Sequence, residues 1–166
     1  PNVPDLVALV DIDHNQTTLY IAKNGEFIYS REQLFGGAQL TDAIQNRYGL
    51  SAEEATISKR ERTLPDDYYP EVLTPFIENT IQQITRSLQF YFSSSQYSSI
   101  DHVVLAGGSS SIAGLAGMAQ QRLGVPVTIA NPFINMTIAP HIDDEQLAID
   151  APSLMSAWGL ALRSFD

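Results

Sequence analysis

The sequence predicts an α/β domain in which three antiparallel strands precede an alternation of helices and strands. Residues 6–13 form a nearly continuous apolar run with β-branched side chains, which is typical of a strand buried on both faces. The Asn24–Gly25 pair separates two alternating segments and supplies the positive-φ residues of a tight hairpin turn. Within residues 68–95, apolar side chains recur on one stripe, as in a long amphipathic helix.

The first third of the chain is expected to be a three-stranded antiparallel meander. Its first strand ends in two carboxylates, Asp11 and Asp13. Residues 17–23 alternate between apolar and polar side chains, and residues 26–31 alternate again after the hairpin turn.

Two helices are expected after the meander. Gly36 and Gly37 break the strand pattern, and apolar residues then recur at helical spacing until Gly49 ends the helix. Ser51, followed by two glutamates, indicates the start of a second helix. Gly36 and Gly37 also allow another backbone or a ligand to come close, although the start of a helix would need the same flexibility.

The second half of the chain alternates between helices and strands. After the long helix, the expected order is a strand at 102–106, a helix at 112–123, a strand at 125–130, a loop at 132–140 and a terminal helix at 152–163. Three antiparallel strands followed by this order describe one lobe of the ribonuclease H-like architecture, which is also the repeated unit of the actin fold.

Composition limits the classes of function. A chain of 166 residues that is 44% hydrophobic can bury one sizeable core. Because it contains no cysteine, it has no disulfide framework, thiolate zinc site or cysteine nucleophile. A formal charge of -10 disfavours the phosphate contacts that drive nucleic-acid binding, and only Lys59, Arg60 and Arg62 form a basic cluster. We therefore expect no nucleic-acid partner.

The apolar runs and the first residue bear on location and completeness. The longest apolar stretches, 6–10 and 103–106, are far shorter than the roughly 20 residues that span a bilayer. Any membrane association is therefore expected to come through a partner. The chain opens at Pro1 directly before a strand pattern, so the natural protein is expected to continue upstream.

The segment 11–18 has the outline of a phosphate-binding loop. Asp11 lies at a strand end, a tight turn follows, and the hydroxyls of Thr17 and Thr18 come next. A carboxylate in that position can hold magnesium through water. Asp13 weakens the pattern, because glycine is usual where amides approach an anion and a second carboxylate repels it. The alternative is a hairpin in which Asp13 and its neighbours form an Asx turn.

A second candidate loop follows the strand at 102–106. Gly107 and Gly108 lie between that strand and a helix, an arrangement that leaves amides directed at an anionic ligand, and nucleotide binding is a natural use. The alternative is a plain connection in which Ser110 or Ser111 caps the helix.

Other chemical patterns are weaker. The acidic run 143–145 beside His141 could hold a metal, but such a run in a proline-bounded loop is more often a solvated surface. The chain has no nucleophile elbow and no Walker sequence, so a hydrolase triad is not supported and no catalytic residue is assigned.

Read together in order, five segments resemble the second half of the PilM family of type IV pilus assembly proteins, which is related to the actin-like protein FtsA. They are VDIDHNQTTLYI, FGGAQLTDAI, HVVLAGGSSSIAGL, LGVPVTIANPF and SAWGLALR. The resemblance covers nearly the whole chain, and the order of the segments makes it specific. It implies an ATP-binding, actin-like scaffold that links the pilus platform to its motors and so serves twitching motility.

The resemblance also implies roles for individual residues. Asp11 corresponds to the acid of the second phosphate loop, near a magnesium ion held through water, and Lys59 to a lysine that leans on the nucleoside. The family has a glutamate where this chain has Thr56, and actin-like ATPases have glycine where it has Asp13. The remaining cofactor-binding positions are Thr17 and Thr18 beside the phosphate loop, Gly36 and Gly37 at the opening of the smaller subdomain, and Gly107, Gly108 and Ser109 in the adenosine loop.

The implied domain division is that of the second actin lobe. Residues 1–36 and 68–166 would form subdomain 2A, residues 37–67 would form a small inserted helical subdomain 2B, and the N-terminal lobe would be absent. ATP and magnesium would require that missing lobe. The chain alone is therefore expected to bind ATP weakly and to be inactive, and the whole protein to be at most a slow ATPase.

The implied partners are pilus proteins. They are the cytoplasmic N-terminal tail of PilN, whose site is expected on the missing lobe, the pilus motor ATPases, and a second copy of the protein through self-association. The implied location is cytoplasmic and peripheral at the inner membrane, through these partners.

Two other functions stay open at this point. A ribonuclease H-like nuclease would need a second carboxylate at the end of the strand at 102–106, where the chain has Gly107 and Gly108. One lobe of a sugar or acetate kinase would need a catalytic carboxylate from outside this chain, and it rests on fold analogy alone.

Overall fold

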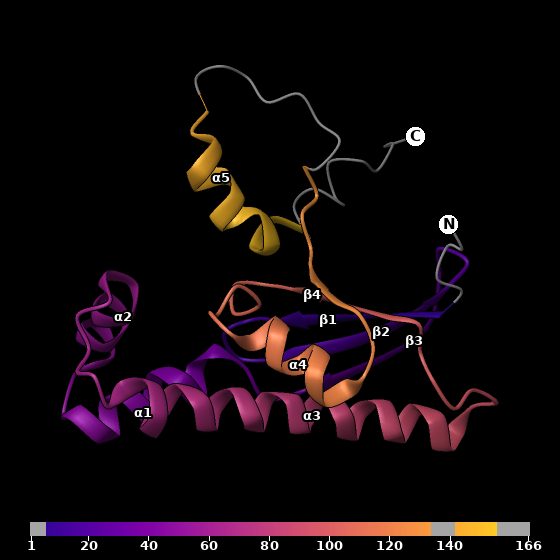
Figure 1. The fold of residues 1–166 in the computed structure, drawn as a ribbon, viewed down its shortest axis with the longest axis horizontal. Helices are drawn as coiled ribbons and strands as arrows, with labels where there is room; N and C mark the ends of the chain where they lie inside the picture. The colour runs from indigo at the N-terminus through magenta and orange to yellow at the C-terminus, as the bar shows by residue number, and fades with distance from the viewer. Residues whose placement is uncertain (1–5, 134–141, 156–166) are drawn as a thin grey trace.

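The computed structural model describes residues 6–133 and 142–155. Five strands form one mixed sheet in the order β3-β2-β1-β4-β5 (Figure 1). Strand β1 pairs antiparallel with β2 and parallel with β4, which in turn pairs parallel with β5. The strands are β1 (Leu6–Ile12), β2 (Thr17–Lys23), β3 (Glu26–Gln33), β4 (His102–Ala106) and β5 (Val127–Ile129). The predicted α/β lobe is therefore confirmed.

The helices up to residue 123 follow the predicted order, whereas the helix at 144–150 was not predicted. The helices are α1 (Gly37–Tyr48), α2 (Ala52–Glu61), the π-helical turn η1 (Tyr69–Leu73), α3 (Thr74–Ser94), α4 (Leu115–Leu123), α5 (Asp144–Asp150) and the 3-10 turn η2 (Ala151–Leu154). Within the described residues, no helix has the length and apolar character needed to cross a membrane. The predicted loop 132–140 and helix 152–163 lie largely outside the described residues.

Local sequence signals explain the first half of the chain. Asn24 and Gly25 have φ values of 53° and 83° and form the predicted hairpin turn between β2 and β3. Gly49 ends α1 with φ 66°. The Ser51 hydroxyl accepts a hydrogen bond from the Glu54 amide, and the Glu54 carboxylate accepts one from the Ser51 amide, so a capping box begins α2.

The long helix packs along one face of the sheet, and α4 lies beside it (Figure 1). Its buried stripe includes Ile77, Ile81, Ile84 and Leu88. Aromatic contacts hold both ends of α3 against the first third of the chain. Near its start, the Phe76 ring stacks on the Phe35 ring with 5.7 Å between ring centroids, and near its end the centroids of Tyr91 and Tyr29 lie 4.9 Å apart. Helices α1 and α2 lie together at one end of α3 (Figure 1).

Several predicted boundaries differ for physical reasons. The first strand is not buried equally on its two faces, because residues 6, 8, 10 and 12 are buried whereas 7, 9 and 11 are half-buried. The long helix opens as a π turn, since Pro75 has no N–H to donate and the Thr74 amide bonds the Tyr69 carbonyl five residues back. Helix α4 begins only after Gly114, whose φ is 88°.

The acidic run 143–145 is not part of a loop. Its first residue, Asp143, caps α5, with its Oδ1 accepting hydrogen bonds from the amides of Glu145 at 2.9 Å and Gln146 at 3.1 Å. An aspartate in this position needs no bound cation to explain it. Among the described residues, no three histidine or acidic side chains gather where they could hold a metal ion.

Candidate functional site

The carboxyl ends of β1 and β4 meet because the two strands are parallel, with Asp11 opposite Ala106. Gly107 follows at once, with φ 86°. A Cβ atom at Gly107 would lie 2.5 Å from the carbonyl oxygen of Ile12 and 2.6 Å from Oδ1 of Asp11. Glycine is therefore required here by the close approach of β1, and the Asp11 carboxylate lies against this backbone.

Most amides of the 107–110 loop are already hydrogen-bonded. The Gly107 amide donates to the Pro152 carbonyl at 2.9 Å, the Ser109 amide to the Ile12 carbonyl at 3.0 Å and the Ser110 amide to the Gly107 carbonyl at 3.1 Å. Within this loop, only Gly108 keeps an amide with no bond to a described residue, and a Cβ atom at Gly108 would meet nothing within 4 Å. The amides of Ser111 and Ala113 likewise have no bond to a described residue, so the loop and its continuation offer a ligand more than one amide.

The turn between β1 and β2 binds helix α1. The Asp13 amide closes the turn by donating to the Gln16 carbonyl at 2.9 Å. The Asp13 carbonyl accepts from the Gly37 amide at 2.9 Å, and the His14 carbonyl accepts from the next amide. A Cβ atom at Gly36 would overlap both carbonyl groups. Gly36 is thus needed for a close approach of backbone to backbone.

The two threonines of the expected phosphate loop are buried, with 6% and 5% of their surface exposed. The Thr17 hydroxyl donates to the Phe35 carbonyl at 2.6 Å, and Thr18 lies opposite Asp11 in the β1–β2 pair. Thr17 therefore supports the junction of β2 with α1, and neither threonine lines the cavity described below.

Asp11 is the carboxylate that keeps an unusual environment. Its side chain is half-buried, and burial, with the nearby Asp13 charge adding to it, raises the pKa of the Asp11 carboxyl. A carboxylate that the protein holds at such a cost is a candidate functional group. Among the described residues, no group of three or more acidic or histidine side chains lies where it could hold a metal ion. A magnesium ion at Asp11 would therefore take its other oxygen ligands from water and phosphate.

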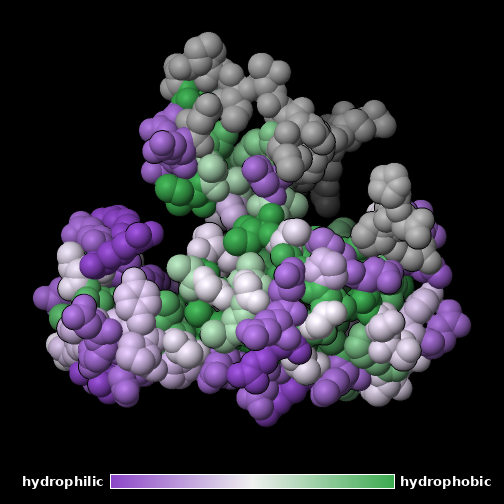
Figure 2. All heavy atoms as spheres, in the orientation of Figure 1, coloured by the Kyte–Doolittle hydropathy of each residue, from purple (hydrophilic) through white to green (hydrophobic). Residues whose placement is uncertain are grey.

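A cavity of about 490 Å³ opens between α2 and the 107–113 segment, in the size range of small-molecule sites. The surface is hollowed between the polar surface of α2 and the centre of the molecule (Figure 2). The described residues that line the cavity are the cations Lys59, Arg60 and Arg62, the apolar and aromatic residues Leu40, Leu64, Tyr68, Tyr69, Leu73, Ile112 and Ala113, and the small residues Gly37, Gly108, Ser109 and Ser111.

The charge of this cavity is opposite to that of the chain. Three cations line it, and its described lining contains no carboxylate, although the formal net charge is -10. Lys59 is half-buried, burial lowers the pKa of its ammonium group, and no carboxylate of the described residues pairs with it. A desolvated cation without a counter-charge favours an anionic ligand. The Thr56 hydroxyl donates to the Ala52 carbonyl of its own helix at 2.8 Å.

Some of the predicted cofactor-binding residues line the cavity, and others do not. Gly37, Lys59, Gly108 and Ser109 line it, whereas Asp11, Thr17, Thr18, Gly36 and Gly107 are not among its lining residues. Sequence reasoning missed the aromatic wall at Tyr68 and Tyr69. The signal was a basic cluster in an acidic chain, followed within ten residues by two tyrosines.

Comparison with known proteins gives one family and one fold. The family described as type IV pilus assembly protein PilM matches residues 2–165. A chain of a solved PilM–PilN type IV pilus biogenesis complex superposes with a TM-score of 0.82 at 29% identity, over 96% of this chain and 46% of that one. This chain therefore spans about half the length of the solved proteins it matches.

More distant structures share the fold alone. The ethanolamine utilization protein EutJ from Carboxydothermus hydrogenoformans gives a TM-score of 0.65 at 20% identity, over 95% of this chain and 49% of that one. An archaeal actin homologue gives 0.62 at 16% identity, over 98% and 50%. The lobe is therefore of the actin-like type.

Proposed function

The chain belongs to the PilM family of type IV pilus assembly proteins, and on that premise we propose that it is one lobe of an actin-like scaffold that binds ATP and magnesium. The observation that carries the proposal is the cavity beside α2. It combines an apolar and aromatic wall, suited to a base, with three cations and no described carboxylate, suited to phosphates. A nucleotide has both chemistries in one molecule.

Each residue at the cavity has its own proposed role in binding the nucleotide. Lys59 supplies a half-buried charge that no carboxylate of the described residues pairs with, and Gly108 supplies an amide and room for close approach. Ser109 lines the cavity between them. Asp11 lies at the neighbouring strand end, where it would hold magnesium through water, and the metal would neutralise phosphate charge. The backbone junctions that hold these groups in place are formed by Gly36, Gly107, Thr17 and Thr18.

The proposed site is complete only with a further lobe. Residues 37–67, the proposed subdomain 2B, supply one side of the cavity with the cations, and the proposed subdomain 2A, residues 1–36 and 68–166, supplies the other. In this proposal any hydrolysis is slow and serves assembly, because two of the nucleotide positions, Asp13 and Thr56, are altered. The chain alone is proposed to bind ATP weakly or not at all.

The proposed biological role is that of a scaffold. In this role the protein binds the cytoplasmic tail of PilN, a partner suggested by the similarity to the solved PilM–PilN complex. It also links the pilus platform to the motor ATPases and to further copies of itself at the cytoplasmic face of the inner membrane. Binding of a PilN tail peptide to the full-length protein, measured with and without Mg-ATP, tests this role. An affinity for the peptide that no nucleotide changes would refute an ATP-controlled scaffold.

The nucleotide site is tested by replacing its cations in the full-length protein. Lys59→Gln should weaken binding of a fluorescent ATP analogue about tenfold, because a charge-assisted contact is lost. Arg86→Gln, which removes an exposed cation from α3 outside the cavity, is the matched control and should leave the affinity unchanged. Equal losses in both variants would mean that only net charge matters and that the cavity is not the site.

A further inference from the structure

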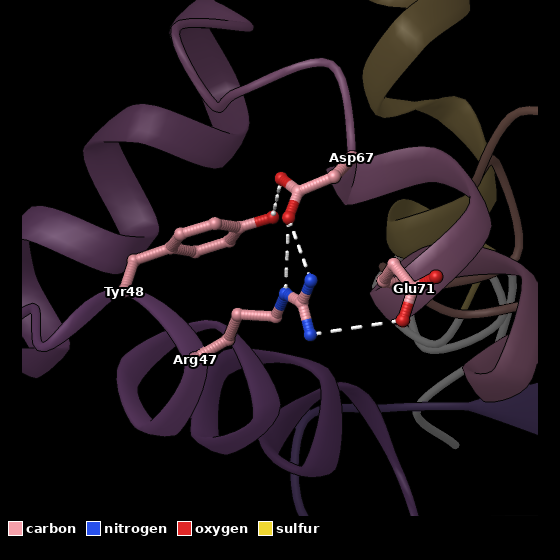
Figure 3. Close-up of polar contacts among 4 residues, drawn as sticks. All are labelled: Arg47, Tyr48, Asp67 and Glu71. Carbon is pink, nitrogen blue, oxygen red and sulfur yellow. Dashed lines mark hydrogen bonds and ion pairs between the residues drawn. The ribbon is translucent and has the colours of Figure 1, made fainter.

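Four polar residues form a network between the end of α1 and residues 67–71 (Figure 3). Arg47 and Tyr48 end helix α1, Asp67 precedes the π turn η1, and Glu71 lies within it. The Asp67 Oδ2 atom accepts from Arg47 Nη2 at 2.7 Å and from Nε at 3.2 Å, and Oδ1 accepts from the Tyr48 hydroxyl at 2.8 Å. Arg47 also lies 3.7 Å from a Glu71 carboxylate oxygen.

Both oxygens of Asp67 are therefore in use. The hydrogen bonds from Arg47, and then from Tyr48, lower the pKa of the Asp67 carboxyl, so it stays ionised through the neutral range. The guanidinium of Arg47 spans Asp67 and Glu71, which are four residues apart along the chain. The end of α1 is thus tied to the 67–71 stretch at both of its ends.

The residues next to these anchors form the cavity wall. Tyr68 and Tyr69 follow Asp67 directly and, with Leu73, line the cavity. The anchors Asp67 and Glu71 line a separate hollow with Arg47 and Tyr48 instead. The segment therefore has one set of side chains held by α1 and another that faces the cavity.

The backbone of this segment needs outside support. The Thr74 amide bonds the Tyr69 carbonyl in a π turn, a conformation that occurs rarely and is frequent at functional sites. Pro70 lies within the turn and Pro75 follows it, and neither residue has an amide hydrogen to donate. The Glu71 amide donates to the Asp67 carbonyl at 3.0 Å, and the side-chain hydrogen bonds of Asp67 tie the same stretch to α1.

We propose that Asp67 is a positioning residue for the cavity, which with Arg47 and Tyr48 clamps residues 67–73 so that the two tyrosines hold the base of the ligand. This inference rests on the proposed nucleotide site and adds a set of contacts that hold one wall of that site in position. It predicts that breaking the clamp loosens the wall and weakens the ligand without unfolding the lobe.

The test uses the full-length protein with Mg-ATP as the probe. Asp67→Asn and Arg47→Gln should each weaken binding about fivefold, and the double variant should lose less than the product of the two, because both act through one contact. Tyr48→Phe, which removes a single hydrogen bond, should lose less than either. Arg122→Gln breaks another exposed pair, with Glu78 at 3.3 Å, and should leave the affinity unchanged.

Hydrogen exchange in the absence of nucleotide separates this inference from the proposed function. Asp67→Asn should speed exchange of the amides in 68–74 at least tenfold, and Arg122→Gln should not. If the wild-type protein binds no ATP, the proposed function fails, and the exchange result alone decides whether the clamp exists. Unchanged exchange in Asp67→Asn, or independent effects in the double variant, would overturn the inference.

Discussion

Replacing Gly107 with alanine should destabilise the lobe far more than the same change at the next residue. Gly107 has φ 86°, and the left-handed region costs other residues about 1–2 kcal/mol. The new Cβ atom would also lie 2.5 Å from the Ile12 carbonyl oxygen, and relieving such a contact in packed backbone costs about 1–3 kcal/mol. A loss of about 3 kcal/mol follows, or roughly 6–12 °C in Tm for a chain of this size.

The matched control is Gly108→Ala. Its Cβ atom would meet nothing within 4 Å, so its Tm should stay within about 2 °C of wild type. Circular dichroism melts of the two variants and the wild type give the comparison directly. Equal melting temperatures for Gly107→Ala and Gly108→Ala would refute the packing of β1 against this loop, on which the position of Asp11 depends.

Two further predictions concern titratable groups. Burial raises the pKa of Asp11 in the folded state, so its ionised form lowers the stability of the fold as pH rises. The Asp11→Asn variant should therefore melt at or above the wild-type temperature at pH 7, and in the full-length protein it should lose Mg-ATP binding. A lower Tm for the variant would contradict this. Burial raises the pKa of Tyr68 to about 12, whereas an unfolded tyrosine ionises near pH 10, so wild-type stability should fall between pH 10 and 12. Tyr68→Phe should lose less over that window, measured as urea midpoints, and an equal loss would place Tyr68 in solvent.

The fold could be predicted from the sequence because its signals are local. The Asn24–Gly25 turn, the Gly49 end of α1 and the Ser51 capping box each depend on residues within a few positions, and the structure has all of them. The π turn at the start of α3 was not predicted. Pro75 has no amide hydrogen to continue a regular helix there, and the contact between Arg47 and Asp67 that holds the preceding stretch joins residues 20 positions apart in the sequence.

The site was harder to predict because its residues are defined by tertiary contacts. Thr17 has the right residue type for a phosphate loop, yet its hydroxyl bonds the Phe35 carbonyl, a partner 18 residues away. The sequence at Gly36 was consistent with a close approach of a backbone or a ligand and with a simple helix start, and only the packing on the β1–β2 turn shows that backbone comes close. Tyr68 carries no motif, and only the tertiary structure brings it into the wall of the same cavity as Lys59 of α2.

Calorimetric titration with Mg-ATP tests the proposed nucleotide site, using the full-length protein, this chain alone and an Asp11→Ala variant of the full-length protein. We expect saturable binding by the full-length protein, weak or no binding by this chain, and loss of binding in the variant. No binding by the full-length protein would contradict the nucleotide site and leave a pilus scaffold that works without ATP.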